Sequence, residues 1–128
     1  MPKILIIEDE PDLLKVFSDM LEQDKFEVIE AKDGKEGLQV AIDSKPDLIL
    51  LDILMPVMDG IAVLKEIKIN EALKNIPVIV LTNYSDNQKI AEAMEHGAYG
   101  YLIKINLKND DLAKNIRSAL SKNAHPKN

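Results

Sequence analysis

Five short apolar runs divide the chain, and the segments between them space their apolar residues differently. The runs cover residues 3–7, 26–30, 48–51, 77–81 and 99–103. The first, third and fourth runs consist almost wholly of Ile, Leu and Val, which is typical of parallel strands buried on both faces. The second run partly alternates between apolar and polar residues. The pattern therefore predicts five strands and favours an edge position for the second.

Between the runs, apolar residues recur every three or four positions, as on one face of an amphipathic helix. Each predicted helix carries such a set: Leu13, Leu14, Phe17, Met20 and Leu21; Leu38, Ala41 and Ile42; Val63, Leu64 and Ile67; Ile90, Ala91 and Met94; Leu112, Ile116, Ala119 and Leu120. Pro11 suits the first turn of the first helix, where its missing N–H costs nothing. Gly97 suits a left-handed end to the fourth helix.

Two capping boxes, Asp33 with Glu36 and Ser85 with Gln88, are typical of the starts of the second and fourth helices. With the five apolar runs, the predicted helices give a strict alternation of strand and helix. A closed barrel of eight strand–helix units needs about 250 residues, so 128 residues fit only an open sheet. Right-handed crossovers then predict an α/β fold with a doubly wound, five-stranded parallel sheet in the flavodoxin-like order 2-1-3-4-5 and helices on both faces. Ligands of such folds bind at the carboxyl ends of the strands.

Composition agrees with a single folded domain, since 46% of the residues are hydrophobic and 30% are charged. The chain has no cysteine, which excludes a disulfide framework and a thiolate metal site and fits a reducing cytoplasm. The first apolar run is too short for a signal peptide or a membrane span, so we expect no membrane association. The net charge of −6 argues against nucleic-acid binding by this segment.

Polar side chains follow four of the five predicted strands. Glu8 and Asp9 follow the first strand, Asp52 the third, Thr82 the fourth and Lys104 the fifth. Taken singly, each residue has an ordinary explanation, because acids open helices and lysines lie on surfaces. Parallel strands end at one rim of the sheet, however, so we expect these side chains to gather there as a functional site.

The chemistry of this group favours phosphoryl transfer. Three neighbouring acids cannot all stay ionised without a cation, and oxygen ligands without Cys or His favour Mg²⁺ or Mn²⁺ over zinc. Lys104 offers a point charge to a phosphoryl oxygen or to Asp52, and Thr82 offers a hydroxyl donor. These groups suffice for transfer onto an aspartate, and Asp52 is the central carboxylate.

Residues 50–60, with the sequence LLDILMPVMDG, resemble the phosphoacceptor segment of response-regulator receiver domains. The resemblance continues across nearly the whole chain. It implies that Asp52 is the phosphoacceptor and that Lys104 and Thr82 are catalytic. It also implies that Thr82 and Tyr101 form the switch that responds to phosphorylation.

The same resemblance implies a metal site. Asp9, Asp52 and the backbone carbonyl of Leu54 should ligate Mg²⁺ directly, and Glu8 should act mostly through water. Gly60 should allow close approach of the backbone where the loop after the acceptor enters the third helix.

As a member of this family, the chain would be a cytoplasmic switch of a two-component system. A histidine kinase or a phosphotransfer protein would supply the phosphoryl group, and phosphorylation would change the affinity for a downstream effector protein or domain. The affected face would comprise the fourth helix, the fifth strand and the fifth helix. The domain would catalyse its own phosphotransfer and slow autodephosphorylation without being a conventional enzyme. The receiver domain would cover residues 1–122, and residues 123–128 would form a tail or the start of a linker.

Two other functions remain open. A degenerate receiver would only bind proteins, and two departures from the family pattern support it: Asn83 replaces a usual small residue, and Ile105 replaces the proline that usually follows Lys104. The intact set of acids, hydroxyl and lysine argues against it. A Mg²⁺-dependent phosphohydrolase of the haloacid-dehalogenase type needs a second aspartate two residues after the nucleophile, where this chain has Leu54.

Overall fold

The computed structural model describes residues 1–55, 58–83, 87–104 and 107–124, and in these ranges strands and helices alternate as predicted. The strands are β1 (Lys3–Ile7), β2 (Glu27–Ala31), β3 (Leu48–Asp52), β4 (Val78–Thr82) and β5 (Gly100–Ile103). The helices are α1 (Pro11–Gln23), α2 (Gly34–Ser44), α3 (Gly60–Ile69), α4 (Asn87–Glu95) and α5 (Asn109–Ala124).

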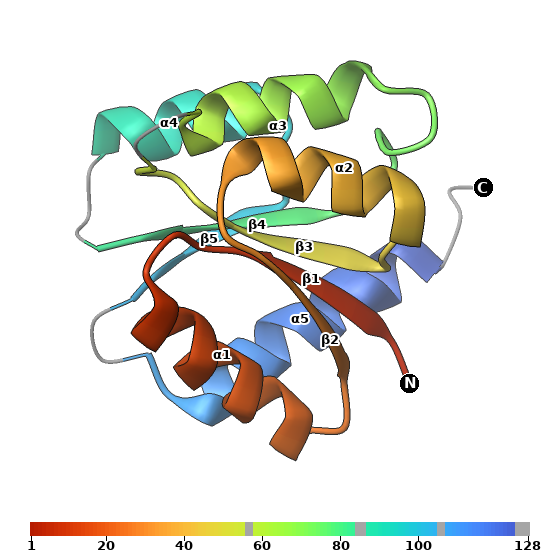
Figure 1. Cartoon of the computed structure of the whole chain (residues 1–128), viewed down its shortest axis with the longest axis vertical. Helices are drawn as coiled ribbons and strands as arrows, with labels where there is room; N and C mark the ends of the chain where they lie inside the picture. Colours follow the sequence, from red (N-terminus) through yellow and green to blue (C-terminus); the bar gives the residue numbers. More distant parts are fainter. Residues whose placement is uncertain (56–57, 84–86, 105–106, 125–128) are drawn as a thin grey trace.

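The strands form one parallel sheet in the order β2-β1-β3-β4-β5, which confirms the predicted topology and the edge position of β2 (Figure 1). β2 begins one residue later than predicted, because the N–H of Phe26 donates to the carbonyl of Leu21 at the end of α1. β3 and β4 end one residue later than predicted, so Asp52 and Thr82 are the last residues of their strands.

Helices cover both faces of the sheet, with α2, α3 and α4 on one side and α1 and α5 on the other (Figure 1). Successive side chains of β1 enter opposite cores: Leu5 and Ile7 pack on the side of α2 and α3, and Ile4 and Ile6 pack on the side of α1 and α5. All four are fully buried. The continuous apolar runs in the sequence therefore follow from a sheet that has no solvated face.

The capping box predicted at the start of α2 is present, but one of its two hydrogen bonds has a different donor. The Asp33 carboxylate accepts a hydrogen bond from the Glu36 N–H at 2.8 Å, as predicted. The Glu36 carboxylate accepts from the N–H of Lys32 at 2.6 Å and not from that of Asp33. The second predicted box, which begins at Ser85, lies outside the described residues.

The two other terminus signals are confirmed. Pro11 is the first residue of α1, where no helical hydrogen bond is lost. Gly97, in the turn between α4 and β5, has a φ angle of +97°, a conformation that side chains with a Cβ rarely adopt.

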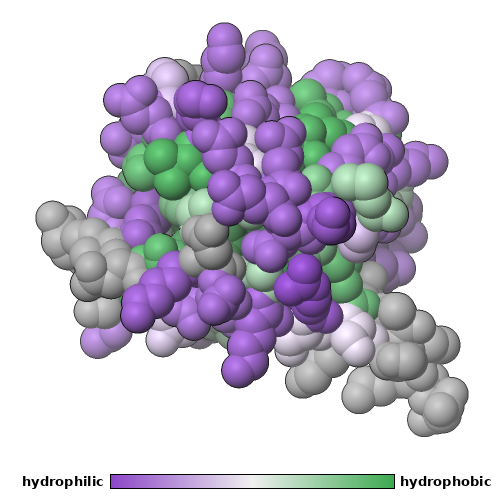
Figure 2. Space-filling model, turned by 90° about the horizontal axis from the view of Figure 1, so that it is seen from below, coloured by the Kyte–Doolittle hydropathy of each residue, from purple (hydrophilic) through white to green (hydrophobic). Residues whose placement is uncertain are grey.

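The surface of the α1 and α5 layer, seen from below in Figure 2, is mostly hydrophilic, with hydrophobic side chains in separate patches. Val16 of α1 is one large apolar side chain that stands half exposed. Among the described residues, no helix combines the length and the apolar character needed to cross a bilayer.

Gly60 provides a test of backbone packing behind β3. A Cβ at Gly60 would meet the carbonyl oxygen of Asp52 and the Cα of Ile53, which confirms the predicted close approach. We expect Gly60→Ala to lower the free energy of unfolding by about 1–3 kcal/mol, because the backbone must shift to relieve the overlap. Gly100→Ala is the matched control, since a Cβ there meets nothing within 4 Å. Urea unfolding followed by circular dichroism measures both, and equal midpoints for the two variants would contradict the packing argument.

Candidate functional site

Three acids meet where β1 and β3 end side by side. Asp52 closes β3 and is only 3% exposed, and Glu8 and Asp9 directly follow β1. One carboxylate oxygen from each of the three lies within 4.8 Å of the others. The structure thus brings together the three acids singled out from the sequence, because neighbouring parallel strands end at the same rim.

Lys104 reaches this group from beyond the end of β5. Its side chain is 4% exposed, and its Nζ lies 2.7 Å from Glu8 Oε1 and 3.2 Å from Asp52 Oδ1. Its backbone N–H donates to the carbonyl of Thr82 at 2.7 Å, which ties the start of the following loop to the end of β4. Thr82 itself is buried at the same rim. All five rim residues selected from the sequence therefore lie in one region.

Glu8 is the most enclosed acid of the group. It is fully buried, and its Oε2 accepts a hydrogen bond from the N–H of Glu10 at 3.2 Å. Its Oε1 faces the Lys104 ammonium as an ion pair but accepts no well-directed hydrogen bond from the described residues. A water-mediated role in metal binding is what the sequence predicts for Glu8, and the direct pair with Lys104 has no signal in the sequence.

The electrostatics of the group favour a proton or a cation. Burial raises the pKa of Asp52 to about 7, and the charge of Glu8 adds to this rise, whereas Lys104 opposes it. Burial by itself lowers the pKa of the Lys104 ammonium, but its contacts with Glu8 and Asp52 outweigh burial and raise that pKa above its ordinary value. The charge of one ammonium therefore does not balance three carboxylates, and the excess negative charge favours binding of a further cation.

The loop after Asp52 folds back over the end of β3. The N–H of Leu54 donates to Asp52 Oδ1 at 3.2 Å, whereas the Leu54 residue as a whole is 53% exposed. The N–H of Gly60 donates to the carbonyl of Ile53 at 2.7 Å. The Asp59 carboxylate caps α3 by accepting from the N–H of Ala62 at 2.9 Å, so the loop is anchored at both ends.

The remaining predicted positions lie farther out or outside the described residues. Tyr101 lies on the edge strand β5 and is 47% exposed. Asn83 follows Thr82 and is half-buried. Ile105 falls outside the described residues, so the geometry of the bond between Lys104 and Ile105 is not described either.

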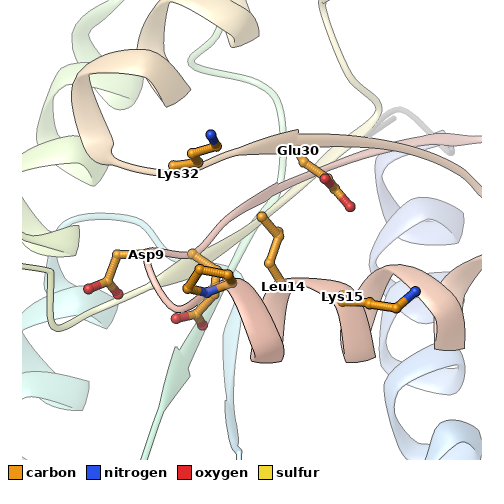
Figure 3. A pocket seen from close by; sticks show the side chains of 7 residues that line it. Asp9, Leu14, Lys15, Glu30 and Lys32 are labelled. Carbon is orange, nitrogen blue, oxygen red and sulfur yellow. The ribbon is translucent and has the colours of Figure 1, made fainter.

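A cavity of about 370 Å³ adjoins the acids on the side of β2 and α1 (Figure 3). Its lining consists of Glu8, Asp9, Pro11, Leu14, Lys15, Glu30 and Lys32. In Figure 3 the Asp9 carboxylate points away from Leu14 and Glu30. The Glu30 carboxylate accepts a hydrogen bond from the hydroxyl of Ser18 at 2.6 Å. Ser18 is buried, and the sequence pattern did not predict this pair. The cavity is therefore a neighbour of the acid group and shares only two residues with it.

Comparison with known families and relatives gives a consistent result. The family model for the response regulator receiver domain matches residues 4–117. The chain is 38% identical over 81% of its length to the DNA-binding dual master transcriptional regulator RpaA of Synechocystis, of which it covers 43%. It is 35% identical over 81% of its length to the polar-differentiation response regulator DivK of Brucella anthropi, of which it covers 85%. The chain thus spans less than half of one relative and most of another.

Solved structures agree with these matches. The chemotaxis protein CheY4 of Vibrio cholerae shares 29% sequence identity, with a TM-score of 0.87 over 93% of this chain and 98% of that one. A response regulator receiver domain protein from Clostridium thermocellum shares 32% identity, with a TM-score of 0.89 over 97% of this chain and 98% of that one. Both similarities cover more than nine-tenths of this chain.

The raised pKa of Asp52 predicts a specific dependence of stability on pH. The ordinary pKa of 3.8 applies to the unfolded chain and a pKa of about 7 to the folded one, so ionised Asp52 destabilises the fold above about pH 7. This penalty fades as the pH falls from 7 towards 3.8. We therefore expect Asp52→Asn to raise the free energy of unfolding by roughly 1–3 kcal/mol near pH 8 in EDTA, with a smaller gain near pH 5.

Urea unfolding curves at the two pH values test this expectation, with Asp43→Asn, an exposed aspartate of α2, as the control. A gain for Asp52→Asn that is equal at both pH values would show that burial of the charge is not its cause.

Proposed function

The chain belongs to the response regulator receiver domain family of two-component signalling, and we propose that it is a phosphorylation-activated switch with Asp52 as its phosphoacceptor. Receiver domains are generally phosphoacceptor signalling modules and not conventional enzymes. The observation that supports Asp52 is its place at the end of β3, where it is buried beside two further acids and in contact with Lys104. The other acids that line the rim follow β1, one strand away.

The residues of the acid group fit a hard divalent cation, and receiver domains bind Mg²⁺ in such an acidic pocket. The donors are carboxylate oxygens without Cys or His, and Glu8 Oε1 lacks a hydrogen bond from the described residues. In our proposal Asp9, Asp52 and the carbonyl of Leu54 hold Mg²⁺ directly, and Mn²⁺ can take its place. When bound, the metal neutralises the acids and the incoming phosphoryl oxygens.

The protein groups supply the remaining chemistry. A carboxylate oxygen of Asp52 attacks the phosphorus, and the bond between phosphorus and the donor's leaving group breaks in line. Lys104, already in contact with Asp52, balances the charge that collects on the phosphoryl oxygens, and the Thr82 hydroxyl donates to one of them. Because Glu8 also holds Lys104, the ammonium is positioned before the donor arrives.

We expect the resulting acyl phosphate to be lost slowly. Hydrolysis requires a water molecule in line with the phosphorus and a polar side chain to orient it. Leu54, two residues after the acceptor, is exposed beside the site and has no polar group for this task. The domain would therefore signal over a longer period than one with a water-orienting side chain at this position.

In this proposal a histidine kinase or a phosphotransfer protein supplies the phosphoryl group in the cytoplasm. The downstream effector is another protein or another domain, because the described chain is a single α/β unit. The proposed output face comprises α4, β5 and α5, where Tyr101 is exposed. The proposed boundary, with a receiver domain at residues 1–122 and a tail at residues 123–128, falls in the last turn of α5.

Phosphorylation should be confined to Asp52 and should require the metal. We expect mass spectrometry after incubation with acetyl phosphate and Mg²⁺ to find one added phosphoryl group in the wild type and in Asp43→Ala, and none in Asp52→Ala. EDTA should prevent the addition, because the acids otherwise repel the anionic donor. Asp9→Asn should raise the Mg²⁺ concentration needed by roughly tenfold or more. Absence of phosphorylation in the wild type would favour the degenerate, protein-binding receiver.

The switch should connect Thr82 with Tyr101. A phosphoryl group that draws the Thr82 hydroxyl inward leaves space for the Tyr101 ring, and it can shift the equilibrium only by its differential affinity for the two states. We expect beryllofluoride with Mg²⁺ to shift amide NMR signals of α4, β5 and α5 more than those of α2 beyond Gly37. Thr82→Ala should reduce these shifts. Unchanged signals throughout residues 90–120 of the wild type would count against this output face.

A further inference from the structure

The outer face of α4 carries an open groove of about 410 Å³. Its lining residues follow the spacing of one helix face: Gln88, Ala91, Glu92, Glu95 and His96. Ala91 belongs to the apolar stripe that the sequence predicts for this helix, but the structure buries Ile90 and Ala93 and leaves Ala91 exposed. The groove therefore combines polar walls with a small apolar side chain that no other element covers.

Two carboxylates of this groove have no counter-charge. Among the described residues, no basic side chain lies within 4.0 Å of the carboxylate of Glu92 or Glu95. The stem of Lys68, on the neighbouring helix α3, lies close to Gly97 after the end of α4. Its ammonium, however, donates to the backbone carbonyls of Lys74 and Ile76. Within the described part of the chain, both glutamates thus stay without an ion pair.

The position of these two acids is unfavourable for the helix itself. Glu92 and Glu95 lie in the last turn of α4, at the negative end of the helix dipole, and this turn contains no basic residue. Departures from favourable local electrostatics are expected at functional sites, where binding offsets their cost. A cation held in the groove would offset both the carboxylates and the negative end of the helix.

The groove lies on the same side of the sheet as Tyr101 of the proposed output face. Tyr101 is in register with Val80, whose side chain is buried in the core beneath α2, α3 and α4. Residues in register on parallel strands point to the same side of the sheet, so Tyr101 emerges on the side that α4 covers (Figure 1). Tyr101 and Met94 of α4 are both exposed. This side of the molecule therefore offers exposed aromatic and apolar side chains together with unpaired acids, a combination that suits a protein partner.

We propose that the groove on α4 is the docking site for an arginine side chain of the downstream effector. The inference rests on the proposed function, in which α4 is part of the output face. A guanidinium group carries five N–H donors in one plane and can bind two carboxylates at once, whereas its aliphatic stem can pack on Ala91. The net charge of −6 would also attract a basic partner to this chain.

The test uses two peptides that differ in a single charge. The first is an acetylated and amidated pentapeptide with one arginine between alanines, and in the second the uncharged isostere citrulline replaces the arginine. Each is titrated into the ¹⁵N-labelled protein in EDTA and followed by amide NMR. We expect the arginine peptide to shift the signals of residues 88–96 and to bind severalfold more tightly than the citrulline peptide, because only its side chain pairs with the two glutamates.

Three variants separate this site from other acidic groups. Glu92→Gln combined with Glu95→Gln should weaken binding of the arginine peptide severalfold and raise the urea midpoint of unfolding, because two charges leave the negative end of α4. Glu66→Gln, at an exposed glutamate of α3, is the matched control and should leave the affinity unchanged. Asp52→Ala should bind the peptide as the wild type does, so failure of the proposed phosphorylation and failure of this docking site give different results.

Equal affinities for the two peptides, or equal affinities of the double variant and the wild type, would overturn the proposal. A lower urea midpoint for the double variant would also overturn it, because the two acids would then stabilise the fold. Shifts as large at residues 8–10 and 52 as at residues 88–96 would show general attraction to acidic groups and not docking. Wild-type dimers in sedimentation that the double variant loses would assign the groove to a second copy of this chain in place of the effector.

Discussion

The ion pairs of Lys104 with Glu8 and Asp52 join three segments that are far apart in the chain. They bring the end of β5 into contact with the ends of β1 and β3, across β4. Truncation of Lys104 would leave two buried acids without their counter-charge, so the rim depends on this one cation. The geometry of the site therefore depends on one ammonium that two acids share.

This shared ammonium leaves the rim with an excess of negative charge, and the excess has a structural cost. The raised pKa of Asp52 means that its ionised form is less stable in the fold than in water. Natural sites often keep such destabilising charge where function requires it. In the proposed function, this excess of negative charge favours the binding of a cation, and the bound cation in turn offsets the repulsion between the acids and a phosphoryl group. The packed strands on either side of Asp52 cannot relax to relieve it, because both faces of the sheet are covered.

Much of the fold could be predicted from local patterns. Runs of Ile, Leu and Val marked the buried strands, because a strand covered on both faces has no position for a polar residue. Asp33 and Gly97 marked helix ends, because hydrogen bonding and φ angle at these points depend on a single residue. The shared rim was predictable too, since parallel strands joined by right-handed crossovers end at the same edge. The positions of Asp52 and Thr82 at the ends of β3 and β4 are enough to predict that both lie at this rim.

The sequence by itself thus determined which elements form, the order of the strands and which residues stand at their ends. The tertiary structure alone decided how those side chains pair. The contact of Glu8 with Lys104 and that of Ser18 with Glu30 join residues on different elements, and each depends on side-chain direction as well as on position. Hydrophobic periodicity shows which face of a helix or strand is buried. It does not show which polar side chains form pairs, because such pairs depend on distances of a few ångströms between elements that come together only in the complete fold.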